Sequence, residues 1–351
     1  SPIEGTSPSK IEMYVGSHPL PSDENERATE RIIDLLSGCT ENDLVLMLIS
    51  GGGSTLLCSH KAPMTCLNES ALFSELTAQG ATIQDINTVR KHTSQARGGG
   101  LAKAAYPAEV VSLIVSDVPG NDIDVIASGP TVLDSSTIED AKSVLEKYRI
   151  TAAANIEFLE TPKEPKYFER VHNALFLSSQ NALAAMQSEA ARLGYVATIV
   201  DDRFDGEARE TGRAIVDALH DAPEKTALLY AGESTVLLPP TRHGADEPSP
   251  RQSGLLPRKG GRNQELALAA LADIQDDEII LSFASDGHDN TDHAGAIADA
   301  ETRAHARAQN LSSTEYLDGH RAYDFFTTTN DALVTGYTGS NVSDLIIALK
   351  K

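Results

Sequence analysis

The chain has 351 residues, 40% of them hydrophobic, which suits two domains of ordinary size better than one core. A formal net charge of −22 at pH 7 argues against nucleic acid and anionic membrane surfaces as partners, because such a field repels phosphates at long range. A small phosphate-bearing ligand would therefore need local basic residues, backbone amides or metal ions.

The cysteines and the chain start bear on location. Cys39, Cys58 and Cys66 are odd in number and fit no zinc-binding spacing, so we expect reduced thiols in a cytoplasmic protein. No apolar run has the length that spans a bilayer, and the first residues carry no secretion pattern. The chain begins with Ser1 and no initiator methionine, which fits processing or missing sequence.

The first half alternates predicted strands and helices, the pattern of a parallel α/β sheet. An unbroken apolar run at 44–49 predicts a buried strand. The other predicted elements are a short strand at 11–15, helices at 23–36, 69–79 and 136–148, and a strand at 110–118.

Two glycine triplets are candidates for binding phosphate. The first follows the apolar run in a turn where no Cβ keeps an anion from the backbone N–H groups, although a turn without a ligand produces the same glycines. It is not the common phosphate loop, since no lysine follows. The second opens an Ala-rich helix, whose N–H groups and dipole favour an anion. The candidate residues are Gly51, Gly52, Gly53, Ser54, Gly98, Gly99 and Gly100.

A basic run before the second triplet is the one strongly basic segment of this acidic sequence. It contains Arg90, Lys91, His92 and Arg97. A guanidinium matches a carboxylate or phosphate geometrically, whereas a lysine supplies a point charge. The run therefore predicts anion binding by Arg90 or Lys91, with an exposed helix face as the alternative.

Acidic loops follow two predicted strands, where α/β sheets commonly build their sites. Asp117 lies at the end of the strand predicted at 110–118, and Asp286 and Asp289 follow the strand at 279–285. Carboxylates of this kind suit Mg²⁺ or a general base, and they are also common turn formers.

The second half contains further strand and helix units after a linker at 160–170, which divides the chain into domains at 1–160 and 170–351. Helices are expected at 181–193, 206–219 and 263–272, strands at 195–202 and 279–285, and two β segments around Gly232 within 226–240. Arg262 stands just before a predicted helix that begins with Asn263. It could stabilise transferring charge, or it could be an ordinary surface residue.

Several of these segments resemble the successive signature blocks of glycerate 2-kinases, whose C-terminal part is called the MOFRL domain. The blocks are LISGGGSTLL, INTVRKHTSQARGGGLAKAAYP, VSDVPGNDIDVIASGPT, AGESTV, GGRNQELALAAL, SDGHDNTDHAGA and VTGYTGSNVSDL. The resemblance implies a two-domain α/β kinase with a Rossmann-like N-terminal domain, a parallel sheet, a C-terminal MOFRL-type domain and a site in the interdomain cleft. It further implies transfer of the γ-phosphoryl group of ATP to the 2-hydroxyl of glycerate, with Mg²⁺, giving 2-phosphoglycerate.

Carried onto this chain, the resemblance suggests roles for particular residues. The predicted catalytic residues are Arg262, Asp117 and Asp286; the substrate-binding residues are Arg90, Lys91 and Asn263; and the Mg²⁺ ligands are Asp117, Asp286 and Asp289.

The chain also departs from the family. Members normally begin with a further segment that carries a catalytic lysine, and nothing before Ile11 matches it, so we expect an N-terminal domain that is incomplete at its start. The alternatives are a hydroxypyruvate reductase and a shortened, non-catalytic binder of a nucleotide or organic acid. Neither glycine triplet fits the G-x-G-x-x-G pattern of dinucleotide binding, which disfavours the reductase. A homodimer is a possible assembly that the sequence does not decide.

Overall fold

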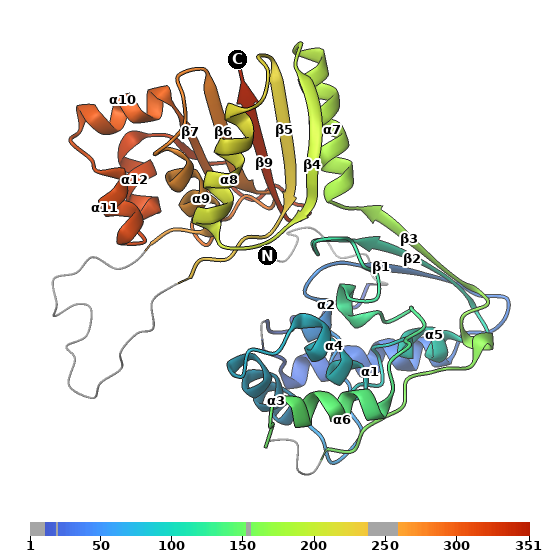
Figure 1. Ribbon diagram of the computed structural model, residues 1–351. Coiled ribbons are helices and arrows are strands. Elements are labelled where there is room, and N and C mark those ends of the chain that lie inside the picture. Colours follow the sequence, from blue (N-terminus) through green and yellow to red (C-terminus); the bar gives the residue numbers. More distant parts are fainter. Residues whose placement is uncertain (1–10, 19, 152–155, 238–258) are drawn as a thin grey trace, which may run out of the picture. The chain divides into compact units, whose positions relative to one another are not determined.

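The computed structural model describes residues 11–18, 20–151, 156–237 and 259–351. The chain divides into two compact units (Figure 1). Unit 1 comprises Ser1–Val115 and Asp122–Phe176, and unit 2 comprises Ser116–Asn121 and Leu177–Lys351. Both units combine helices with a sheet, which confirms the predicted two-domain α/β class. The strand predicted at 11–15 does not form.

The described part of unit 1 contains a three-stranded sheet in the order β1-β2-β3. β1 and β2 are parallel, with Leu44 opposite Glu109 and Ile49 opposite Ile114. β3 runs the same way, because the N–H of Val110 donates to the carbonyl of Arg170 and that of Ser116 to Leu177, both at 2.8 Å. The predicted parallel sheet is therefore confirmed. The elements are α1 (Asp23–Ser37), β1 (Leu44–Ile49), α2 (Gly53–Leu56), α3 (Cys66–Ala78), α4 (Ile83–Lys91), α5 (Gly100–Ala105), β2 (Glu109–Val115), η1 (Ile126–Ser128), α6 (Ile138–Lys147), η2 (Pro165–Tyr167) and β3 (Val171–Leu177).

Among the described residues, side chains pack against one face of β1. Val45 and Met47 pack with Leu36 of α1 and Leu101 of α5. The alternate side chains stay exposed, with 67% of Leu44, 59% of Leu46 and 77% of Leu48 accessible. The prediction of a buried strand was wrong for this face, because an apolar run does not reveal whether a second layer covers it.

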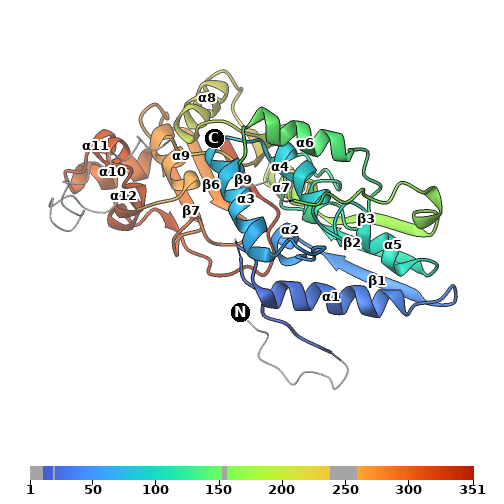
Figure 2. The same cartoon turned by 90° about the horizontal axis from the view of Figure 1, so that it is seen from below.

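Helix starts in unit 1 follow from local sequence. Thr65 and Thr82 accept hydrogen bonds from N–H groups in the first turns of α3 and α4. Such caps satisfy donors that a helix start otherwise leaves unpaired. α3 and α4 then pack Leu72, Leu76 and Val89 into a shared core with α6. Figure 2 shows the helices of unit 1 beside its sheet.

The described part of unit 2 holds a six-stranded mixed sheet in the order β4-β5-β9-β6-β7-β8. β4 and β5 are parallel, and the other neighbours are antiparallel. α7 packs on one face with Leu229 and Leu345, while α8 and α9 pack on the other with Tyr230 and Ile346. The elements are α7 (Ser179–Arg192), β4 (Val196–Phe204), α8 (Ala208–His220), β5 (Thr226–Gly232), α9 (Arg262–Ala270), β6 (Glu278–Ala284), β7 (Gly295–Asp299), α10 (Ala300–Ala308), α11 (Ser313–Asp318), α12 (Ala322–Thr329), β8 (Ala332–Leu333) and β9 (Asp344–Lys350).

The segment at 160–170 lies inside unit 1, and β3, which follows it, pairs with β2. Residues 116–121, by contrast, belong to unit 2 although they follow β2 directly. Across the described ranges, no helix is both long enough and apolar enough to cross a bilayer.

The cysteines differ from expectation. Cys58 and Cys66 form a disulfide, whereas Cys39 is a half-buried free thiol. The prediction of three reduced thiols was therefore wrong. Residue count and spacing alone did not reveal that the turn after α2 brings Cys58 back to the first residue of α3.

Candidate active site

The first glycine turn connects β1 to α2 in unit 1. Gly52 has φ of 78°, in the left-handed region, and a Cβ on Gly53 would lie 2.5 Å from Cβ of Ala127. Within the described residues, the backbone N–H groups of Gly51, Gly52 and Gly53 have no hydrogen-bond acceptor. The hydroxyl of Ser54 accepts a hydrogen bond from Ser128 at 2.9 Å. The turn therefore has donors available to an anion.

The second glycine triplet differs. Gly98, Gly99 and Gly100 are buried, and the first two donate their N–H groups to the carbonyls of Ser128 and Gly129 at 2.9 and 2.8 Å. The N–H of Gly100 donates to Arg97. These glycines serve close packing, since a Cβ on Gly100 would lie 2.1 Å from the carbonyl oxygen of Gln95. The sequence suggested free N–H groups here, and the structure shows that neighbouring backbone uses them.

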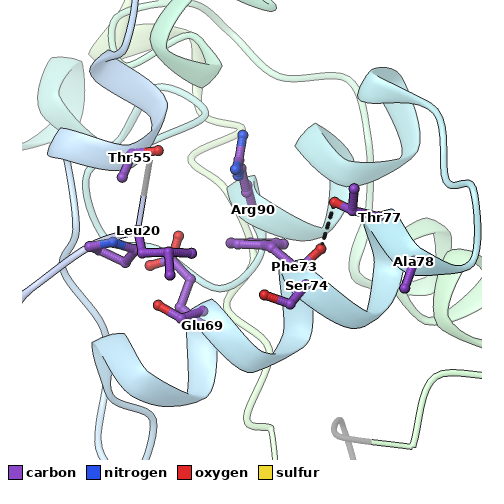
Figure 3. Close-up of a pocket in the computed structure, with 10 residues that line it drawn as sticks. Leu20, Thr55, Glu69, Phe73, Ser74, Thr77, Ala78 and Arg90 are labelled. Carbon is purple, nitrogen blue, oxygen red and sulfur yellow. Dashed lines mark hydrogen bonds between the residues drawn. The ribbon is translucent and has the colours of Figure 1, made fainter. Parts of the chain in front are cut away.

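A pocket of about 480 Å³ is lined by residues of α2, α3 and α4 (Figure 3). Arg90 comes from α4, and its guanidinium carbon lies 4.5 Å from the ring centre of Phe73 on α3. No ion pair of Arg90 is found within the described residues, and its buried Nε has no hydrogen-bond partner there. The remaining lining residues are Leu20, Pro21, Thr55, Glu69, Ser70, Ser74, Thr77 and Ala78.

The charges at this pocket favour an anion. Arg97 is fully buried and pairs with Glu69, with 2.7 Å between Nη2 and Oε1. Burial, with the nearby charge of Arg97, lowers the pKa of Arg90 to about 10. Glu69 therefore pairs with Arg97, and among the described residues no carboxylate pairs with Arg90.

Lys91, the neighbour of Arg90, is already occupied. Its ammonium is buried and pairs with Asp124 and with Asp134, at 3.3 Å for the latter. Hydrogen bonds from Ser136 and Thr161 also reach Asp134, and despite its burial these contacts and Lys91 lower the pKa of that carboxyl. Of the two basic residues predicted to bind an anion, Arg90 is the one without an ion pair among the described residues.

Arg262 is the first residue of α9 in unit 2, and two acids hold its side chain. Its Nη2 lies 2.9 Å from Oε1 of Glu233 and 3.3 Å from Oδ1 of Asp344, and its Nε also pairs with Asp344. Burial raises the pKa of Asp344 to about 6 despite this ion pair. The Arg262 side chain is 32% exposed, so these ion pairs fix its orientation while part of the side chain stays accessible.

Asp289 caps the start of α9. Its carboxylate accepts hydrogen bonds from the backbone N–H groups of Asn263 and Gln264 at 3.2 and 2.9 Å, and from both side-chain amides. Burial nevertheless raises the pKa of Asp289 above its ordinary value. The carbonyl oxygen of the buried Asn263 side chain accepts a hydrogen bond from Ser282 at 2.7 Å. Both residues are thus engaged in holding α9, although the sequence suggested ligand roles for them.

Asn341 links the two remaining acidic loops of unit 2. Its side-chain nitrogen donates to Oδ2 of Asp117 at 3.5 Å, and its oxygen accepts from Ser285, the residue before Asp286. Asp286 accepts a hydrogen bond from the N–H of His288 at 2.9 Å. Both carboxyl groups are half-buried. Within the described residues, Asp117, Asp286 and Asp289 do not form a compact three-carboxylate cluster.

Sequence reasoning missed the residues that hold these groups. Glu69, Glu233 and Asp344 are the carboxylates that position Arg97 and Arg262. Asp344 offered one signal, because a charged residue opening an apolar strand is unusual. Glu69 in its helix and Asn341 in a loop offered none.

Two domain families match the sequence. Residues 2–160 match the family described as "Domain of unknown function (DUF4147)", and residues 226–344 match the MOFRL family.

Proteins similar over nearly the whole chain have kinase names. A D-glycerate 2-kinase of Thermotoga maritima is 38% identical, over 97% of this chain and 80% of the relative. A crystal structure of glycerate kinase from Thermotoga maritima matches with a TM-score of 0.86 and 37% identity, over 99% of this chain and 82% of that one. A relative from Agrobacterium vitis, 36% identical over 96% of this chain and 76% of its own length, bears the name "Putative hydroxypyruvate reductase".

Proposed function

The chain belongs to the glycerate 2-kinase family, and on this basis we propose how its residues divide the work of phosphorylating glycerate. The protein is a glycerate kinase, a phosphotransferase with an alcohol group as acceptor. Kinase activity implies ATP as the phosphate donor. The similarity to glycerate 2-kinases carries this conclusion.

Arg90 binds the carboxylate of glycerate in this proposal. Its guanidinium borders a pocket of about 480 Å³, which is large enough for a three-carbon acid, and it has no ion-pair partner among the described side chains. A forked cation beside several hydroxyl groups suits a hydroxy acid. Lys91 is excluded from this role because Asp124 and Asp134 hold it.

The first glycine turn and Arg262 bind phosphate oxygens in this proposal. The N–H groups of Gly51, Gly52 and Gly53 supply fixed partial positive charge without needing to reorganise. Arg262 supplies a full charge, and its paired acids hold it in one orientation. Phosphoryl transfer depends mainly on positioning and on stabilising negative charge, so these are the contributions that the reaction requires.

Asp117 and Asp286 are the proposed Mg²⁺ ligands and proton acceptors. They fit the ion chemically, because Mg²⁺ takes one or two carboxylates together with phosphate oxygens and water. When bound, Mg²⁺ would neutralise charge on the phosphates. The carboxyl group that does not hold the ion accepts the proton of the glycerate 2-hydroxyl. Asp289 is left out because it caps α9.

The decisive experiment compares two reactions with the same protein. Glycerate and ATP with Mg²⁺ should yield ADP and 2-phosphoglycerate, measured separately for each glycerate enantiomer. Hydroxypyruvate and NADH should show no loss of NADH. The second reaction is included because one relative is named as a reductase. Consumption of NADH with no ADP formed would refute the kinase, and ligand binding with neither reaction would identify a non-catalytic binder.

We also propose a cytoplasmic location, where ATP is available, and a homodimer as the assembly. Fractionation of the source cells and light scattering of the purified protein test these two statements.

A further inference from the structure

A second group of potential ligands lies in unit 1 and has no part in the proposed phosphoryl transfer. Cys58 follows α2, Cys66 is the first residue of α3, and His60 stands between them in the chain. The cysteines are 0% and 2% exposed, and the His60 side chain is fully buried. Among the described residues, one ligand atom from each lies within 4.8 Å of the others.

The spacing of these atoms suits a tetrahedral ion. Nδ1 of His60 lies 3.8 Å from Sγ of Cys58 and 4.0 Å from Oε1 of Glu26 on α1, and Oε2 of Glu26 lies 3.9 Å from Sγ of Cys66. Zinc bonds of about 2.3 Å to sulfur and about 2.0 Å to nitrogen or oxygen separate neighbouring ligand atoms by roughly 3.3 to 3.8 Å. Small side-chain movements would shorten the observed separations of 3.8 to 4.0 Å to these values.

The orientation of His60 fits the same role. Its Nε2 lies 2.6 Å from Oε2 of Glu69, and Oε1 of Glu69 pairs with the buried Arg97 at 2.7 Å. A carboxylate on one ring nitrogen fixes the ring and directs the other nitrogen to a metal, which is the usual arrangement around metal-binding histidines. Here the other nitrogen, Nδ1, is the one that faces Cys58.

The disulfide governs whether this site exists, because bonded sulfur atoms cannot serve as thiolate ligands. The Cα atoms of Cys58 and Cys66 are 6.8 Å apart, at the upper end of the distances that disulfides span, so the sulfurs can separate after reduction without bringing the backbones closer. A phosphine reductant breaks the sulfur–sulfur bond, takes oxygen from water to become its oxide, and leaves two thiols. Metal binding then releases the two thiol protons.

We propose that the reduced chain binds one zinc-class ion through Cys58, His60 and Cys66, with Glu26 as fourth ligand, and that the disulfide form does not bind it. The ion would join α1, the segment after α2 and the start of α3. Glu69, Ser70 and Phe73 of α3 line the pocket beside Arg90, so the ion would also steady one wall of that pocket.

Cobalt(II) is the spectroscopic probe. The full chain is divided into an untreated disulfide sample and a sample reduced with a phosphine under nitrogen, and each is titrated with Co²⁺. The reduced sample should show thiolate-to-cobalt charge transfer and tetrahedral visible bands that saturate at one ion per chain. Zn²⁺ should abolish these bands and raise the Tm of the reduced protein. The disulfide sample should show neither effect.

Variants assign the ligands. Cys66→Ser should weaken the charge-transfer band, because only the Cys58 thiolate remains, and the double variant Cys58→Ser with Cys66→Ser should lose it. His60→Asn should weaken the band or shift its wavelength. Cys39→Ser is the matched control, because it removes the cysteine outside the cluster and should leave the spectrum unchanged. Reduced wild-type protein without these bands, or equal binding by the disulfide form, would overturn the proposal. The comparison of reduced and disulfide wild-type protein needs no variant, so it tests the proposal even if a substitution prevents folding. It is also independent of kinase activity.

Discussion

Arg90 should lower the stability of the folded chain while serving the substrate, so replacing it should separate the two effects. Burial, with the like charge of Arg97, lowers its pKa from 12.5 to about 10. At about 1.4 kcal/mol per pKa unit, this difference corresponds to a cost of at most about 3.5 kcal/mol. At pH 7, below both pKa values, the group is charged in the folded and unfolded states, so the full cost is present.

Arg90→Gln removes this cost together with the stacking on Phe73, which contributes about 1 kcal/mol. The net gain in stability should be about 1 to 2 kcal/mol, a rise in Tm of roughly 2 to 8 °C for units of this size. Loss of a charged contact to the glycerate carboxylate should cost about 1.5 to 3 kcal/mol, a roughly 10- to 150-fold rise in KM for glycerate. KM for ATP should change little.

The assay combines thermal unfolding at pH 7 with initial rates of ADP formation. Lys91→Gln is the matched neighbour, and it should lower Tm because it leaves Asp134 buried without Lys91. Arg192→Gln removes an exposed ion pair and should change neither quantity. A lower Tm with an unchanged KM for Arg90→Gln would refute the reasoning, because Arg90 would then be a structural residue.

Three further predictions concern unit 2. Arg262→Gln should lower kcat by about 100-fold or more, measured by ADP formation at saturating substrates, and a loss under threefold would remove Arg262 from the transition state. Asp289→Asn should lower the free energy of unfolding by about 1 to 3 kcal/mol in a denaturant titration, since it disturbs the cap of α9. Asp286→Asn should raise the Mg²⁺ concentration needed for half-maximal rate. If each variant instead showed the effect expected of the other, the roles of Asp286 and Asp289 would be exchanged. The folded-state pKa of Asp344 is raised to about 6, so its contribution to stability is present at pH 4 and declines as the pH rises to 7. The stability of the wild-type protein should therefore fall relative to that of Asp344→Asn over this range. If the stabilities of the two proteins changed with pH in parallel, the raised pKa would be contradicted.

The sequence predicted many of the individual strands and helices, because periodicity and glycine turns are local signals. The apolar run at 44–49 gave β1, and the block around Arg262 gave α9. It could not distinguish the two glycine triplets, since the partners of the second lie about thirty residues away at Ser128 and Gly129. Whether an N–H is free depends on tertiary contacts that composition does not contain.

The same limit applied to the charged residues. Arg90 and Lys91 are adjacent in sequence, yet one borders a pocket and the other pairs with Asp134. Adjacent positions on a helix face different directions, so the difference depends on what packs around α4. Asp289 was predicted as a metal ligand from its loop, but that loop returns to the start of α9.

The exposed leucines of β1 bear on how the purified protein should behave in solution. Leu44, Leu46 and Leu48 form a row on one face of a short strand, and apolar surface of this kind associates more strongly as temperature rises towards ambient. Samples concentrated in the cold should therefore scatter more light on warming and clear again on cooling. Dilute, cold stocks and a Leu46→Gln variant would keep the chains apart while kinetic constants are measured.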